Sequence, residues 1–337
     1  MGIQIGKVTT RNNVFLAPMS GVTDEPFRKV AHDTGAGLVV SEMVASDALV
    51  QERRDMVRRA RGAKQLQPFA MQLAGREAKW MSEGAKVAQD MGADIIDINM
   101  GCPARQVTGG LSGSALMRDL GHAVTLIEAT VAAVKVPVTL KMRLGWDDGM
   151  RNAPELARYA EASGIAMVTV HGRTRCQFYK GKADWNAILA VRDAIKIPLV
   201  ANGDCNTADD ARAMLAASGA DAVMVGRGAY GRPWLPGQIA EALERGTGGK
   251  PLGLSQELAL LLRQQDETLA LYGATLGNKI FRKHLSWTVT RLEERELISD
   301  EAAASHRTAL LGETDNAAVT RLLRSIYSDF PQERLVA

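Results

Sequence analysis

Short runs of branched apolar residues recur along the first two thirds of the chain, and turn-forming residues bound each run. Such runs have the length and composition of buried parallel strands, which are hydrophobic along nearly their whole length. The pattern predicts strands over residues 14–18, 37–41, 68–73, 94–99, 136–142, 166–170, 198–202 and 221–225.

Apolar residues at helical spacing fill the segments between these runs. The spacing predicts helices over residues 26–34, 79–91, 123–134, 153–163, 185–195 and 208–218. Gly164 and Gly219 each follow one of these segments, as suits a helix that ends in a left-handed residue. Repeated strand–helix units predict an α/β fold, a (β/α)8 TIM barrel, which typically needs about 250 residues. A doubly wound open sheet is the alternative, but the first strand is not followed by the G-x-G-x-x-G pattern.

The alternation stops near residue 243, and a different organisation follows. Residues 244–254 are rich in glycine and contain a proline, so they are expected to be a linker. Beyond them, apolar residues recur at helical spacing, as at Leu285, Val289 and Leu292. We therefore expect a catalytic barrel over residues 1–243 and a small all-helical domain over residues 255–337.

Composition narrows the class of protein. Of the 337 residues, 46% are apolar and 23% are charged, which is ordinary for a globular protein, and the net charge of +3 is too small to indicate a nucleic-acid partner. The chain has no apolar run of membrane-spanning length, and its first residues do not resemble a signal peptide. Its three cysteines are far apart, which argues against a metal site or a disulfide framework. We expect a cytoplasmic protein without a membrane segment or a bound metal.

The fourth predicted strand ends next to a cysteine. Gly101 and Pro103 flank Cys102 and place it on a short, stiff loop. In α/β proteins, ligands bind at the carboxyl ends of the parallel strands. A thiol at this position is placed for chemistry, so Cys102 is the candidate catalytic residue.

The ends of the other predicted strands also carry polar side chains or glycines. These residues are Gln72, Asn99, Lys141, Arg143, His171, Arg173, Asn202, Gly203, Asp204, Gly226 and Arg227. The last two strand-end loops lie where TIM barrels often bind phosphate, because glycines let backbone N–H groups approach the phosphate oxygens. Arg227 adds a charged, forked donor. The sequence therefore predicts a phosphorylated ligand at the mouth of the barrel.

Three features suggest that this ligand is FMN. Lys141 would project into the mouth, where a buried ammonium needs an anionic partner such as a reduced flavin. The amide of Gln72 both donates and accepts hydrogen bonds, as a flavin imide edge requires. Pro18 and Met19 offer an apolar platform at the end of the first strand.

Several motifs, taken together and in order, carry a family resemblance. The matching segments are residues 16–28 (LAPMSGVTDEPFR), 99–103 (NMGCP), 140–143 (LKMR), 170–175 (VHGRTR), 202–204 (NGD), 226–227 (GR), 231–234 (GRPW) and 281–285 (FRKHL). The chain resembles the tRNA-dihydrouridine synthase family, and most of all its bacterial B-type branch. This resemblance implies an FMN-dependent barrel with a helical tRNA-binding domain, which reduces uridine in the D-loop of tRNA to 5,6-dihydrouridine. The resemblance also implies NADPH as the reductant.

The expected chemistry gives Cys102 a specific role. Hydride from flavin N5 adds to C6 of the uracil ring, and a proton must then reach C5 from a general acid. A free cysteine thiol is mostly protonated at neutral pH and can donate its proton. We therefore expect Cys102 to be this acid, and we expect the target base to leave its stack to reach the flavin.

Basic residues are the candidates for RNA contact. Arg143, Arg173 and Arg175 are expected to meet phosphates or base edges, and Asn99 to hold a carbonyl of the uracil or the flavin. Lys279, Arg282 and Lys283 share one face of a predicted helix. A further basic cluster follows the second strand, and it is either an RNA contact or a solvated helix face: Arg53, Arg54, Arg58, Arg59, Arg61 and Lys64.

Three other functions would explain part of the pattern. Another FMN barrel that acts on a free pyrimidine would use the same flavin residues but would leave the helical tail without a role. A non-catalytic RNA-binding barrel would use the basic residues and would not bind flavin. A phosphosugar enzyme would use the phosphate site but would leave Cys102 without a purpose.

Overall fold

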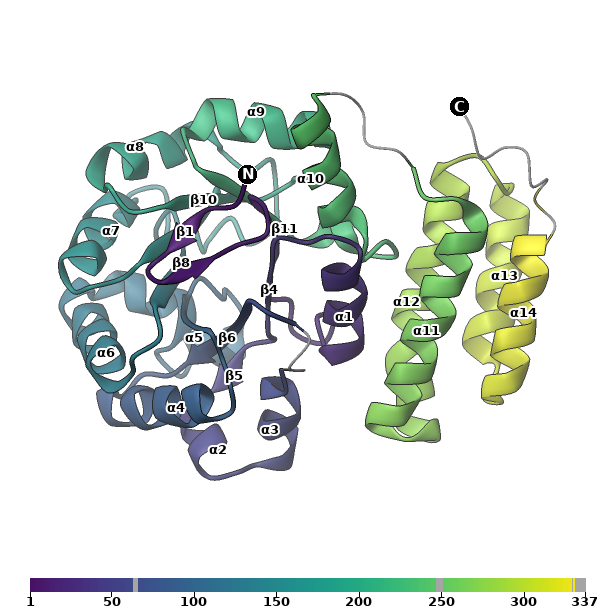
Figure 1. The fold of residues 1–337 in the computed structure, drawn as a ribbon, viewed down its shortest axis with the longest axis horizontal. Coiled ribbons are helices and arrows are strands. Elements are labelled where there is room, and N and C mark those ends of the chain that lie inside the picture. The colour runs from purple at the N-terminus through teal and green to yellow at the C-terminus, as the bar shows by residue number, and fades with distance from the viewer. Residues whose placement is uncertain (63–65, 247–250, 329, 331–337) are drawn as a thin grey trace.

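The computed structural model describes residues 1–62, 66–246, 251–328 and 330. Within these residues eight parallel strands form a barrel: β3 (Val14–Leu16), β4 (Leu38–Val40), β6 (Phe69–Ala74), β7 (Ile95–Met100), β8 (Val138–Arg143), β9 (Met167–His171), β10 (Leu199–Asn202) and β11 (Ala222–Val225). Strand β4 pairs with both β3 and β6, which closes the sheet (Figure 1). The predicted (β/α)8 barrel is therefore confirmed.

Helices surround the barrel. They are α1 (Glu25–Asp33), α2 (Ser46–Val50), α3 (Arg54–Ala60), α4 (Ala78–Asp90), α5 (Arg105–Thr108), α6 (Leu120–Ala133), α7 (Ala153–Ala162), α8 (Asn186–Ala194), α9 (Ala208–Ser218) and α10 (Leu235–Arg245), with short 3-10 helices at Gly113–Arg118 and Arg227–Ala229. Local sequence sets their ends. Thr207 and Asp210 form a capping box at the start of α9, and Gly219 ends that helix in a left-handed conformation with φ 62°.

The barrel interior changes from apolar to polar along the strands. Inward side chains at the amino-terminal end, among them Phe15, Ala70 and Val200, form one buried cluster. The cluster includes Ile5 of the small hairpin made by β1 (Gln4–Ile5) and β2 (Val8–Thr9), which covers this end. Because alternate residues of a strand face the same side, the next inward positions bring polar side chains such as Gln72 to the carboxyl ends.

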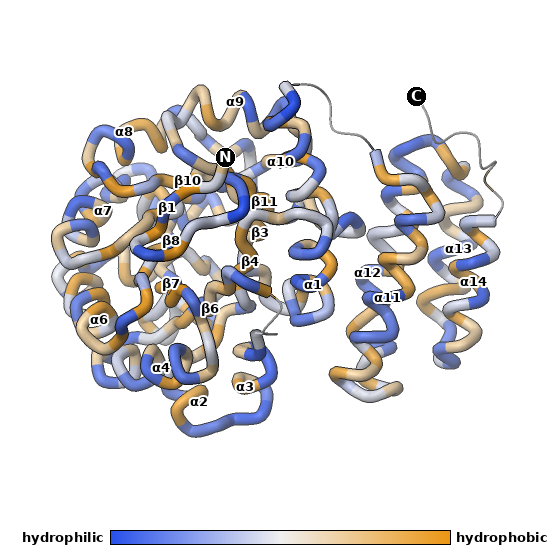
Figure 2. Tube along the Cα trace, viewed as in Figure 1, coloured by the Kyte–Doolittle hydropathy of each residue, from blue (hydrophilic) through white to orange (hydrophobic). Residues whose placement is uncertain are grey.

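Helices α11 (Leu254–Tyr272), α12 (Ala274–Glu294), α13 (Asp300–Gly312) and α14 (Asn316–Ser328) form a bundle beside the barrel, next to α1 (Figure 1). Leu285, Val289 and Leu292 are buried in the core of this bundle, as their spacing predicts. Along these helices hydrophobic and hydrophilic residues alternate, whereas the barrel strands are mostly hydrophobic (Figure 2).

Specific side chains attach the bundle to the barrel. Trp287 of α12 stacks on Tyr230, with ring centroids 4.0 Å apart, and Arg291 donates a hydrogen bond to the carbonyl of Tyr230 at 3.1 Å. Arg263 of α11 pairs with Asp33 at the end of α1, at 2.6 Å. The bundle is therefore held against the face of the barrel that contains α1.

Some elements depart from the sequence-based expectations. The chain after the second barrel strand forms β5 (Val44–Ala45), α2 and α3, where no elements were predicted. Helix α10 extends to Arg245, two residues into the expected linker, and residues 247–250 of that linker lie outside the described residues, as does Lys64 of the basic cluster. No helix of the described residues is both long enough and apolar enough to cross a membrane.

Candidate functional site

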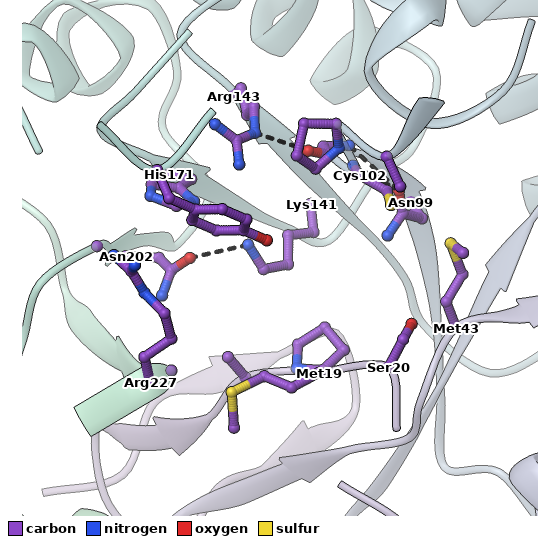
Figure 3. A pocket seen from close by; sticks show the side chains of 18 of the residues that line it. Met19, Ser20, Met43, Asn99, Cys102, Lys141, Arg143, His171, Asn202 and Arg227 are labelled. Carbon is purple, nitrogen blue, oxygen red and sulfur yellow. Dashed lines mark hydrogen bonds between the residues drawn. The ribbon is translucent and has the colours of Figure 1, made fainter. Parts of the chain in front are cut away.

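A cavity of about 730 Å³ lies at the carboxyl ends of the barrel strands (Figure 3). Cys102, Asn99 and Arg143 line it. The residues expected to bind the cofactor line it as well: Pro18, Met19, Gln72, Lys141, His171, Asn202, Gly203, Asp204, Gly226 and Arg227. These positions are spread over more than 200 residues of sequence, and the barrel brings them together.

A buried hydrogen-bond network forms the base of the cavity. The Gln72 amide donates to Asp97 at 2.7 Å and accepts from the amide of Asn99 at 2.7 Å. The hydroxyl of Thr139 donates to the other oxygen of Asp97 at 2.6 Å. Burial raises the pKa of Asp97, although these hydrogen bonds and the charge of Lys141 oppose the shift. The network fixes the orientation of the Gln72 and Asn99 amides.

The loop that carries the thiol is held on both sides. The side-chain oxygen of Asn99 accepts the backbone N–H of Cys102 at 3.0 Å, and the hydroxyl of Ser114 donates to the Cys102 carbonyl at 2.9 Å. Arg143 donates to the carbonyl of Gly101 at 2.8 Å. Cys102 is a free, half-buried cysteine. The backbone around the sulfur is therefore positioned while the thiol itself remains accessible from the cavity.

Lys141 is a buried cation with few partners. Its side chain donates to the amide oxygen of Asn202 at 3.0 Å, and the Asn202 amide in turn donates to the carbonyl of Met224 at 2.7 Å. Burial lowers the pKa of Lys141 to about 8, against the favourable charge of Asp97. An ammonium group has three donors, and one of them is used within the described residues, so the site favours an anionic ligand.

His171, at the end of β9, lies on the cavity among positive charges. Burial lowers its pKa well below the ordinary value, and the nearby charges of Arg143 and Lys141 lower it further. The imidazole is therefore neutral at neutral pH and can offer one donor and one acceptor.

Asp204 organises two arginines at the rim. Arg173 donates to both of its carboxylate oxygens, at 2.9 and 2.5 Å, and Arg227 donates to one of them at 3.1 Å. Burial alone would raise the pKa of Asp204, but the hydrogen bond and charge of Arg173 and the N–H of Ala183 hold it below the ordinary value. Asp204 is therefore ionised, and it fixes the direction in which Arg227 points.

The two glycine-containing loops also present unpaired backbone donors. Within the described residues, the N–H groups of Gly203, Asp204, Gly226 and Arg227 donate no hydrogen bond, although all four residues line the cavity. Gly203 has φ 121°, and a Cβ at this position would lie 3.0 Å from the His171 ring. The loop therefore needs glycine here to lie so close to His171, and together the four amides suit a phosphate group.

The structure places the other predicted substrate-binding residues outside this cavity. Arg173 is buried, and its donors are occupied by Asp204 and by the carbonyls of Lys180 and Gly181. Arg175 stacks on Trp146, with its guanidinium carbon 4.6 Å from the ring centroid.

The three basic residues of α12 lie far along the chain, in the bundle, and differ in their surroundings. Lys279 is exposed and Arg282 is half-buried. Lys283 is half-buried near two barrel carboxylates, and its pKa is lowered by burial while Asp24 and Glu42 oppose the shift. Lys283 therefore faces barrel acids, whereas Lys279 is open to solvent.

Sequence reasoning missed three aromatic residues that line the cavity: Phe178, Tyr179 and Tyr230. Phe178 and Tyr179 line the cavity, and the Tyr179 ring lies 4.8 Å from the guanidinium carbon of Arg227. An aromatic pair between Arg175 and Lys180, in a loop after a barrel strand, is the signal that could have identified them. The described residues contain no cluster of three or more His, Cys, Asp or Glu side chains that could hold a metal ion.

Comparisons with known proteins identify relatives over nearly the whole chain. Residues 15–322 match the profile of the family described as dihydrouridine synthase (Dus). A probable tRNA-dihydrouridine synthase of Rhizobium leguminosarum bv. phaseoli is 56% identical over 84% of this chain and 87% of its own. One from Rhodobacter capsulatus is 50% identical over 98% of this chain and 99% of its own. A tRNA-dihydrouridine synthase B of Xanthomonas axonopodis pv. citri is 46% identical over 85% of this chain and 86% of its own.

Among solved structures, morphinone reductase is similar, with a TM-score of 0.52 and 16% identity over 73% of this chain and 89% of its own. At this identity the likeness concerns the fold alone, and it agrees with the closed barrel described above.

Proposed function

The chain belongs to the dihydrouridine synthase family, and we propose that it reduces uridine in the D-loop of tRNA to 5,6-dihydrouridine with bound FMN and with NADPH as the reductant. The observation that carries this proposal is the single cavity that unites Cys102, Lys141 and Arg227. A thiol, a buried cation and a phosphate-binding rim are the groups that a flavin-dependent reduction of uracil requires.

The cavity fits FMN on two independent observations. The unpaired amides of Gly203, Asp204, Gly226 and Arg227 would hold the phosphate, with the Arg227 guanidinium beside them. The ammonium of Lys141 uses one of its three hydrogen-bond donors within the described residues. Its other donors would bind the electron-rich part of the isoalloxazine ring. Gln72 would contact the imide edge, and Pro18 and Met19 would support the ring from the apolar side.

Bound FMN, once it is reduced by NADPH, would supply the hydride that adds to C6 of the uracil. Cys102 then donates its thiol proton to C5, which completes the saturation of the C5=C6 bond, and solvent returns a proton to the thiolate. Asn99 positions this thiol through the backbone N–H of Cys102. The neutral imidazole of His171 would donate a hydrogen bond to a carbonyl oxygen of the base or the cofactor.

The helical bundle would bind the body of the tRNA. Lys279 and Arg282 lie on α12 with at least part of their surface accessible, where they can meet phosphates without reading sequence. We propose that the boundaries are a barrel domain over residues 1–243, a linker over residues 244–254 and a tRNA-binding domain over residues 255–337. The target base must leave its stack to enter the barrel cavity.

The direct test is to incubate the purified, FMN-loaded protein with NADPH and unmodified tRNA and to measure dihydrouridine by mass spectrometry. Dihydrouridine that is absent from the tRNA of a deletion strain would identify the target positions. Equal rates on free uridine would favour a pyrimidine oxidoreductase. A protein that stays colourless after FMN is added would favour a non-catalytic RNA-binding role.

A further inference from the structure

A second cavity, of about 320 Å³, adjoins the first one between α2, α3 and the segment that joins β6 to α4. We call this cavity the side recess. The two cavities share four lining residues: Met43, Arg59, Gln106 and Val107. A ligand could therefore occupy both of them at once, and Met43 marks the side of the main cavity where they meet (Figure 3).

The side recess combines positive charge with an aromatic face. Arg59, Arg76 and Trp80 line it, together with the acidic residues Asp47 and Glu77. The ammonium of Lys79 lies 4.8 Å from the centroid of the Trp80 ring and adds a further positive charge. Arg59 makes no hydrogen bond or ion pair within the described residues, although it stands at the junction of the two cavities. Arg76 has one long contact of 3.6 Å to Glu77 and one of 3.5 Å to the carbonyl of Gly110. Two guanidinium groups with spare donors are well suited to phosphate oxygens.

Close packing around Ser46 forms one wall of the side recess. Ser46 lines the side recess, and it is fully buried, yet its hydroxyl has no hydrogen-bond partner. A Cβ added to Gly75 would lie 2.5 Å from that oxygen, so Gly75 packs directly against Ser46, and a larger residue would not fit there. The wall at Ser46 is therefore closely packed, and the polar groups of the recess that can meet a ligand are the guanidinium groups of Arg59 and Arg76.

We propose that the side recess binds the phosphate-bearing adenosine half of NADPH while the nicotinamide half reaches the main cavity. This inference rests on the proposed function. The recess has the volume of a small ligand site, about 300 Å³ or more. Trp80 would offer its ring to the adenine, and Arg59 and Arg76 would hold the phosphates.

An RNA nucleotide is a poorer occupant on geometric grounds. A nucleotide inside a tRNA loop is joined to the chain on both sides, so its backbone needs an open groove. The adenosine of NADPH is the end of its molecule and can enter a small recess. The inference also gives a role to one member of the basic cluster after β4, because Arg59 is the member of that cluster that lines both cavities.

The test uses the full-length, FMN-loaded protein and measures the binding of NADP⁺ and of adenosine 2′,5′-bisphosphate by isothermal titration calorimetry. Arg76→Ala and Arg59→Ala should each weaken the binding of both probes by about tenfold or more, as expected for the loss of one charge-assisted contact. Arg53→Ala is the matched control, because Arg53 is an exposed arginine of the same cluster that pairs with Asp55 and lines neither cavity. This control should bind both probes as the wild type does.

A second measurement distinguishes an effect on the binding of the reductant from an effect on the binding of tRNA. With the flavin reduced chemically by dithionite, the KM for tRNA should be the same in Arg76→Ala as in the wild type. Unchanged binding of both probes in Arg76→Ala and Arg59→Ala would overturn the inference. A raised KM for tRNA with unchanged NADP⁺ binding would also overturn it and would assign the recess to RNA. Failure of the proposed function would instead appear as wild-type protein that makes no dihydrouridine, whatever its affinity for NADP⁺.

Discussion

The side-chain oxygen of Asn99 lies 3.0 Å from the backbone nitrogen of Cys102 and accepts its hydrogen bond. The amide nitrogen of the same side chain donates to Gln72, which is anchored in turn on the buried Asp97. The position of the thiol is therefore tied to the interior of the barrel. We therefore propose that Asn99 positions Cys102, and its contact with a carbonyl of the uracil or the flavin stays a prediction.

Asn99→Ala should remove the hydrogen bond that holds the backbone of Cys102 to the interior of the barrel. We expect dihydrouridine formation in single turnovers to fall by about tenfold to a hundredfold, which corresponds to one lost hydrogen bond to a positioned group. Flavin reduction by NADPH should be retained, since Cys102 takes no part in it. Asn99→Asp keeps an acceptor for the N–H of Cys102 and should recover part of the rate. An equal fall in rate in the two variants would show that the lost hydrogen bond to Cys102 does not cause the slower formation of dihydrouridine.

Lys141→Met should weaken FMN binding by about tenfold or more, because it removes a charge-assisted hydrogen bond from a buried site. The wild-type affinity should also fall as the pH rises above 8, since burial lowers the pKa of Lys141 to about 8 in the ligand-free protein. The variant should show no such fall. Fluorescence titration of FMN between pH 6 and pH 9 measures both effects, and parallel pH profiles of the two proteins would contradict this role of Lys141.

Arg173→Ala should lower the stability of the protein and its affinity for FMN more than its affinity for tRNA. Arg173 is buried and holds both carboxylate oxygens of Asp204, so its loss would leave Asp204 without its main counter-ion. Because Asp204 is only half-buried and keeps Arg227 as a partner, we expect the lost charge-assisted hydrogen bonds to cost about 1.5–3 kcal/mol in the free energy of unfolding. We expect a lower melting temperature and a lower FMN content. A stable variant with full FMN and a raised KM for tRNA would instead support direct RNA contact.

Asp24→Asn should change how stability depends on pH. Burial raises the pKa of Asp24 to about 6 from 3.8, so the folded protein binds the proton more tightly than the unfolded chain. The contribution of Asp24 to the free energy of unfolding is therefore largest at pH 3.8 and below. This contribution falls by up to about 3 kcal/mol as the pH rises to about 6. Asparagine keeps an oxygen for the N–H of Phe27, which Asp24 now accepts at the start of α1.

Urea denaturation at pH 4 and at pH 7.5 measures this effect. Relative to the wild type, Asp24→Asn should gain stability as the pH rises between these values. A difference between the two proteins that stays constant with pH would show that the carboxyl of Asp24 does not carry the raised pKa.

The barrel could be predicted from the sequence because each strand–helix unit has a local pattern of apolar residues and turn residues. The run over residues 94–99 became β7 (Ile95–Met100), and the predicted helix end at Gly219 is left-handed in the structure. Helices α2 and α3 could not be predicted in the same way. They are five and seven residues long, too short for a helical period to emerge, and packing against the barrel determines them.

The residues that line the cavity could be predicted where they stand at the end of a strand, and less well where contacts between loops place them. Lys141 and Asn202 follow from strand position alone, and they meet in the cavity. The pairing of Arg173 with Asp204 joins two loops, and the charge of Asp24, in the barrel, acts on Lys283 of the bundle. Contacts of this kind depend on the closed fold, which no local pattern encodes.

We propose that Cys102 delivers the proton to C5 of the uracil. The measurement that tests it most directly is single-turnover formation of dihydrouridine by Cys102→Ala, with the flavin reduced in advance and unmodified tRNA in excess. We expect normal FMN content, normal flavin reduction by NADPH and a rate of dihydrouridine formation lowered by about a hundredfold or more, as for the loss of a general acid. Dihydrouridine formation at the wild-type rate would contradict it.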